Sequence, residues 1–115
     1  MILIVGDTPA PKAKTSVPFK DAKCESRLNE WLGKLGLKRE NCKIVNRTSD
    51  FFELAATLAS KFGIPIIALG NNASRALGEK SHFKLPHPSG KNRQINNKSY
   101  ISRQLAQCRL WLRHV

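Results

Sequence analysis

Three polar side chains lie near the ends of short apolar runs and could together perform hydrolytic chemistry. They are Asp7, Asn46 and His87. A carboxylate in such a place is partly desolvated and can orient a water molecule or oppose developing positive charge. A side-chain amide both donates and accepts, as reading the edge of a nucleobase requires. As alternatives, Asp7 could cap a turn and Asn46 could be an ordinary turn residue.

His87 stands between two prolines, in a polar loop that also contains groups able to hold phosphate. The prolines restrict the backbone on both sides, which suits a preorganised hydrogen-bond donor. Ser89 and Gly90 can contact phosphate through a hydroxyl and through close backbone approach. Lys91 and Arg93 add positive charge. We therefore expect this loop to bind a phosphate-containing ligand.

Phe19 follows Pro18 in an early polar loop that contains three prolines. Its position belongs to no helical or strand-like apolar stripe. Phe19 could anchor the loop in the core, or it could be an aromatic platform on which a base stacks.

The elements that must position these residues form a regular alternation of strands and helices. Short apolar runs predict strands at 2–5, 43–45, 64–69 and 83–85, and apolar positions at helical spacing predict helices between and after them. This order predicts one domain, residues 1–115, with a short parallel four-stranded sheet and helices on both faces. In such α/β folds, ligands bind at the carboxyl ends of the strands. Asp7, Asn46 and His87 should therefore meet at one edge of the sheet.

The second helix has its large apolar residues at regular spacing. They are Phe51, Leu54, Ala55, Leu58 and Phe62, and Gly63 follows them as a stop signal. This spacing predicts an amphipathic helix whose stripe of large residues packs against the sheet.

Charge indicates an anionic partner. The 115 residues include 20 Lys and Arg against 8 Asp and Glu, a formal net charge of +12, and no acidic residue follows Glu79. Such a clustered basic excess favours an anionic polymer as the partner, although a solvated surface would have the same composition. No apolar run approaches the 18 residues of a membrane span, and the run 2–5 is too short for a signal peptide.

The cysteines predict a reduced environment. Cys24, Cys42 and Cys108 are odd in number and widely spaced, with no Cys-x-x-Cys pair. They are typical of core-filling thiols in a cytoplasmic protein and offer no metal-ligand set.

Taken in order, these motifs resemble the uracil-DNA glycosylase superfamily, most closely its compact bacterial and archaeal group that usually holds an iron–sulfur cluster. The pattern runs along nearly the whole chain. Its segments are Gly6-Asp7-Thr8-Pro9, Pro18-Phe19, the turn 35–40, Ile44-Val45-Asn46, Leu69-Gly70, His87-Pro88-Ser89 and the continuation Gly90-Lys91-Asn92-Arg93. The continuation is similar to the mismatch-specific branch. The chain departs from the family by having Asp at position 7 where Glu is usual and Ala at position 10 where Gly is usual. The cluster-binding cysteines are also absent, so we expect no cofactor and no metal.

The resemblance implies a role for each motif residue. Phe19 would stack on a flipped base and Asn46 would hydrogen-bond to its pyrimidine edge. Asp7 would position the hydrolytic water or stabilise the oxocarbenium character of the sugar, and His87 would stabilise negative charge on the departing base. The loop Ser89–Arg93 would line or enter the minor groove of DNA.

The sequence thus predicts a monomeric DNA glycosylase of the base-excision repair type. It would hydrolyse the N-glycosidic bond of uracil or of a related damaged base in single- or double-stranded DNA. The alternative is a catalytically inactive DNA- or base-binding protein on the same fold, which the altered first motif favours. An enzyme acting on a free nucleotide would gain nothing from the charge of +12.

Overall fold

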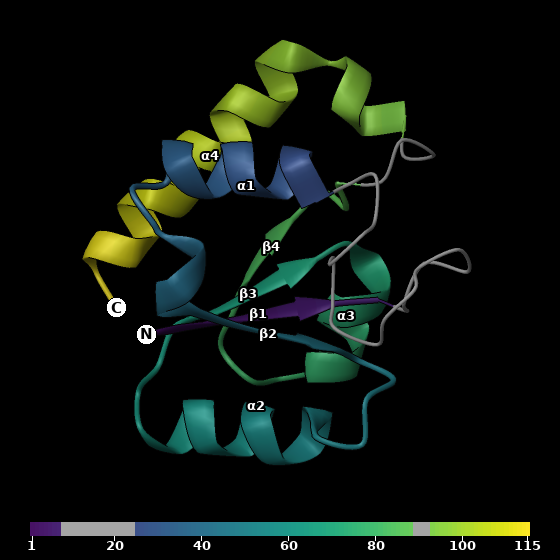
Figure 1. Cartoon of the computed structure of the whole chain (residues 1–115), viewed down its shortest axis with the longest axis vertical. Helices are drawn as coiled ribbons and strands as arrows, with labels where there is room; N and C mark the ends of the chain where they lie inside the picture. The colour runs from purple at the N-terminus through teal and green to yellow at the C-terminus, as the bar shows by residue number, and fades with distance from the viewer. Residues whose placement is uncertain (8–24, 89–92) are drawn as a thin grey trace.

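A four-stranded, all-parallel sheet runs through the centre of the protein (Figure 1), in a computed structural model that describes residues 1–7, 25–88 and 93–115. The strand order is β2-β1-β3-β4. The strands are β1 (Ile2–Gly6), β2 (Cys42–Asn46), β3 (Ile66–Leu69) and β4 (Phe83–Leu85). The predicted parallel sheet is confirmed, and each predicted strand differs from the observed one by two residues or fewer at each end.

Helices cover both faces of this sheet. Helices α1 and α4 pack on one face, and α2 and α3 pack on the other (Figure 1). Their bounds are α1 (Glu25–Lys34), α2 (Phe52–Lys61), α3 (Asn71–Leu77) and α4 (Lys98–Arg113), with short 3-10 helices η1 (Arg39–Asn41) and η2 (Arg93–Asn96). The predicted α/β architecture with two covered faces is therefore confirmed.

Strand β1 shows why the sequence begins with a continuous aliphatic run. Successive side chains of a strand point to opposite faces. Ile2 and Ile4 accordingly enter the core under α1 and α4, whereas Leu3 and Val5 enter the core under α2 and α3. A strand buried on both faces needs apolar residues at every position. All five residues of β1 are buried.

Helix α2 does not present the predicted stripe to the sheet. Its buried residues are Phe52, Ala56 and Ala59. Four of the five residues predicted to be buried are instead exposed, namely Phe51 (71%), Leu54 (60%), Leu58 (42%) and Phe62 (66%), and Ala55 is half-buried. The expectation that the largest apolar residues mark the core face was wrong. Two alanines let α2 approach the sheet closely, and the small core face leaves the bulky stripe outside.

The cysteines of the described residues are free thiols. Cys108 is fully buried in the core beneath α4. Burial raises the pKa of its thiol to about 12, so Cys108 stays protonated and unreactive at neutral pH. Cys24 lies outside the described residues. Within the described part of the chain, no helix is long and apolar enough to cross a bilayer.

Candidate active site

A cavity of about 420 Å³ opens at the carboxyl edge of the sheet, where the loops after β1, β3 and β4 meet. Asp7 and His87 both line it, together with Gly70, Asn72 and Tyr100. Volumes of about 300–1,000 Å³ are usual for cavities that hold small ligands. The parallel strands thus bring together two residues that are 80 positions apart in the sequence.

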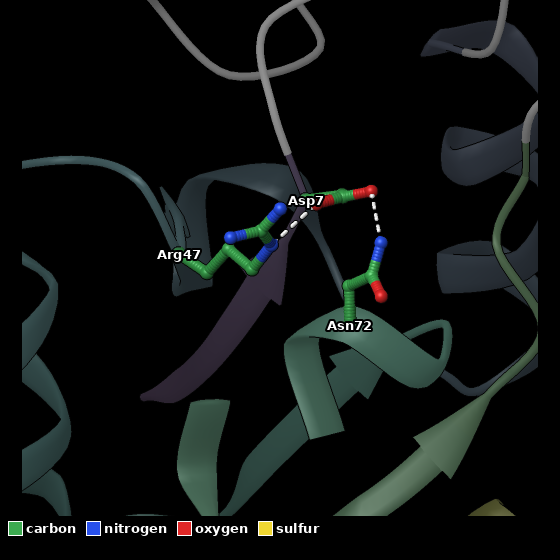
Figure 2. A network of polar contacts seen from close by, with 3 residues as sticks. All are labelled: Asp7, Arg47 and Asn72. Atoms are coloured by element: carbon green, nitrogen blue, oxygen red, sulfur yellow. Dashed lines mark hydrogen bonds and ion pairs between the residues drawn. The ribbon is translucent and has the colours of Figure 1, made fainter. Parts of the chain in front are cut away.

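The Asp7 carboxylate is held by two side chains from distant parts of the sequence (Figure 2). Arg47, just after β2, donates from Nε to Asp7 Oδ1 at 2.5 Å, and the two side chains form an ion pair. Asn72, on α3, donates from Nδ2 to Asp7 Oδ2 at 3.0 Å. Each carboxylate oxygen can accept two hydrogen bonds, so each has room for a further donor such as water.

These partners keep the Asp7 carboxyl ionised. Burial by itself would raise the pKa of Asp7. The hydrogen bonds from Asn72 and Arg47 and the positive charge of Arg47 outweigh that effect, with a smaller electrostatic contribution from His87. The pKa of Asp7 therefore lies below its usual value, and the side chain is a carboxylate at neutral pH.

His87 lines the same cavity and lies on the loop that follows β4. Its neighbour Pro88 is buried, and Arg27 of α1 donates from Nη1 to the Pro88 carbonyl oxygen at 2.6 Å. Burial lowers the pKa of His87, and the Asp7 carboxylate raises it by a smaller amount. The pKa of His87 therefore lies below its usual value, so that His87 is a neutral imidazole at neutral pH.

Gly70 closes the space behind His87. It is the residue before α3 and has a backbone φ of +93°, which L-residues with a side chain rarely adopt. A Cβ at this position would lie 3.2 Å from the Cβ of His87. Glycine therefore suits position 70 for two reasons. It adopts the positive φ of the turn that leads into α3, and its lack of a side chain leaves room for His87.

Asn46 is placed differently from Asp7 and His87. It is the last residue of β2, it pairs with Gly6 across the sheet, and its exposed fraction is 4%. Asn46 is not among the residues that line the cavity, although Gly6 directly precedes Asp7. Arg93 is the first residue of η2. Phe19, Ser89, Gly90 and Lys91 lie outside the described residues.

Sequence reasoning missed the residues that orient this site. Arg47 and Asn72 hold Asp7, and Arg27 holds the loop of His87. Arg47 directly follows the motif residue Asn46, and Asn72 comes soon after the predicted strand 64–69. Both positions are at the carboxyl edge, which is the signal that could have drawn attention to them. Nothing in the spacing indicates that either one binds Asp7.

Fold and site together define a small parallel α/β protein with an acidic and an imidazole group facing one cleft. The model of the uracil DNA glycosylase superfamily matches residues 1–109, which is almost the entire chain. The chain belongs to the uracil-DNA glycosylase superfamily, a family of DNA-repair hydrolases. A search of the curated proteins found no match.

Proposed function

We propose that this protein is a DNA glycosylase that hydrolyses the N-glycosidic bond of uracil, or of a related damaged base, in DNA. The observation that carries the proposal is the shared cavity of Asp7 and His87, in a chain that belongs to this superfamily. Hydrolysis of a glycosidic bond requires one group that acts at the sugar and another that stabilises the leaving base. The two residues supply one group for each side.

Asp7 would act on the sugar side of the bond. It accepts a hydrogen bond from a water molecule and holds the water oxygen toward C1′. The water acquires a positive charge as its oxygen bonds to the cationic sugar, and it then loses its proton readily. A carboxylate with a lowered pKa is a sufficient acceptor for such an acidic proton. Arg47 forms an ion pair with Asp7, so the carboxylate is less able to stabilise positive charge on the sugar. We therefore assign Asp7 the role of positioning the water.

His87 would act on the base side of the bond. As the C1′–N1 bond breaks, its electron pair moves to the base, whose exocyclic oxygen becomes negative. The neutral imidazole can donate an N–H hydrogen bond to that oxygen. The base anion then takes up a proton from solvent, and Asp7 returns to solvent the proton that it accepted from the water. The products are the free base and an abasic site in the DNA.

The direct test is base release from DNA. The protein is incubated with an oligonucleotide that contains one uracil, and abasic sites are then cleaved with alkali. We expect a single cut at the uracil position and an intact strand when thymine replaces uracil. Absence of cleavage on strands with uracil and with other damaged bases would remove the enzymatic proposal.

The alternative function is base or DNA binding without catalysis, and the two contacts of the Asp7 carboxylate favour it. Both Asp7 oxygens already accept a hydrogen bond, and one of them is paired with the Arg47 guanidinium. Such a carboxylate would serve a structural role equally well. A non-catalytic protein would bind the uracil strand with the same salt dependence and release no base, so the two functions separate in the same experiment.

DNA binding should depend steeply on salt concentration. Each phosphate contact on duplex DNA releases about 0.9 counterion, so about 3–5 contacts would lower the affinity roughly 40- to 500-fold for a fourfold rise in salt. Arg75 and Lys84 line the cavity and carry charge at its edge. Fluorescence anisotropy with a labelled duplex measures this slope. A flat response would contradict a DNA-facing role for the basic surface.

Gly70→Ala should lower the rate of base release about 10- to 100-fold by displacing His87, since small misplacements of a catalytic group have effects of this size. Gly78→Ala is the matched control. Gly78 ends the same helix with a φ of +59°, but no atom lies within 4 Å of the Cβ it would gain. Both variants bear the backbone strain, and only Gly70→Ala contacts His87. Equal rates in the two variants would contradict a positioning role for Gly70.

A further inference from the structure

Helix α2 has an exposed apolar stripe, which we define as Phe51, Leu54, Leu58 and Phe62. Their exposed fractions are 71%, 60%, 42% and 66%, and they include four of the seven large hydrophobic residues exposed in the described part of the chain. The remaining three are Met1, Leu110 and Val115. Contiguous apolar surface of this kind usually marks an interaction site.

The spacing of the stripe is almost the same when it is read in either direction. Its residues stand at intervals of three, four and four positions, with a phenylalanine at each end and leucines between them. In an antiparallel pair of such helices, Phe51 of one copy lies opposite Phe62 of the other. Leu54 then lies opposite Leu58. A two-fold interface requires this self-complementarity, because the same surface patch serves both subunits.

Charge along α2 also matches an antiparallel arrangement. Asp50 and Glu53 lie at the amino-terminal end of the stripe, and Lys61 lies at its carboxyl-terminal end; all three are exposed. An antiparallel pair places the acidic end of each helix beside Lys61 of the other copy. A parallel pair would place acids against acids and lysine against lysine.

The charge of this surface does not favour DNA or an anionic membrane as its partner. DNA and anionic membranes both require clustered positive charge. Within the segment 50–62 that contains the stripe, Asp50 and Glu53 outnumber Lys61, although the whole chain carries +12. The α2 face is therefore a place where two copies of this basic chain can approach with little repulsion.

We propose that the α2 stripe is the interface of a homodimer, in which two copies pack their α2 helices antiparallel about a two-fold axis. Helix α2 follows β2 and runs back against the strand direction (Figure 1). The carboxyl edges of the two sheets then point in opposite directions. The cavity that contains Asp7 and His87 stays open in each copy. Such a dimer replaces the monomer expected from the sequence.

The oligomeric state of the DNA-free chain tests this proposal. Sedimentation equilibrium in the presence of a reductant should show the mass rising with concentration from that of one chain towards that of two. Leu54→Gln/Leu58→Gln should weaken the dimer about 10- to 100-fold, because each substitution removes buried apolar contacts in both copies. Leu110→Gln is the matched control, since Leu110 is 55% exposed on α4. It should dimerise as the wild type does.

Charge reversal tests the direction of the helices. Lys61→Glu should weaken the dimer about tenfold, because two symmetric ion pairs become repulsive contacts. Adding Glu53→Lys to that variant should restore most of the affinity. Circular dichroism verifies that each variant is folded. A chain that stays monomeric at every concentration, or a dimer that Leu110→Gln weakens as much as the stripe variant does, would overturn the proposal. No response to either charge change would overturn the antiparallel arrangement.

Discussion

Asp7→Asn is expected to slow base release from a uracil-containing strand by about 10²–10⁴-fold, the range over which a positioned acid–base group contributes. The substitution keeps the size of the side chain but removes the negative charge and one acceptor oxygen. Water is then held less firmly and has no anionic acceptor for its proton. Single-turnover kinetics on a uracil strand measures the effect without a contribution from product release.

Two controls distinguish this loss from a structural one. The Asp7–Arg47 ion pair is partly exposed, with side-chain exposures of 28% and 33%, so breaking it should cost only about 0–1 kcal/mol of stability. Thermal unfolding should therefore change little. Glu40→Gln removes an acidic residue in η1, just before β2 begins, and should leave the rate unchanged. A wild-type rate in Asp7→Asn would show that Asp7 only links the loops through Arg47 and Asn72.

His87→Ala is expected to slow base release by about 10²–10³-fold, as the removal of one preorganised oxyanion donor does in other hydrolases. DNA affinity should stay near the wild-type value, because affinity resides mainly in phosphate contacts. His114→Ala, at the exposed end of α4, is the matched histidine control. Similar rates in His87→Ala and the wild type would contradict a role for His87 on the departing base.

The pH profile provides a second readout for His87. Burial places the pKa of His87 below its usual 6.5. Above that pKa His87 is a neutral imidazole, and as the pH falls through it His87 becomes an imidazolium, which still donates an N–H and adds positive charge beside the departing base. The pKa of Asp7 is lowered from 3.8, so Asp7 is still ionised in this window. The wild-type pH profile should therefore show an inflection that lies below pH 6.5, where His87 titrates, and this inflection should be absent in His87→Ala.

The order of local elements along the chain was enough to predict the sheet and the edge at which the candidate site lies. The strands are short segments rich in apolar residues and the helices have apolar residues at periodic spacing, so both can be predicted from residues that are close in the sequence. The chain order of four strands and four helices then permits few topologies, and in those topologies the ends of parallel strands meet. For this reason Asp7 and His87 could be assigned to one edge before any contact between elements was known.

The contacts that hold those residues, and the face of α2 that packs on the sheet, depend on contacts between elements that are distant in the sequence. The Arg47–Asp7 and Arg27–Pro88 contacts join residues 40 and 61 positions apart. Contacts over such separations produce no repeating pattern in the sequence, so they could not be predicted from it. Helix α2 has apolar residues over more than one face, so periodicity alone did not determine which face packs on the sheet. The packing between elements determined it: one large side chain, Phe52, and two small ones, Ala56 and Ala59, fill the space against the sheet, and the bulky stripe faces outward.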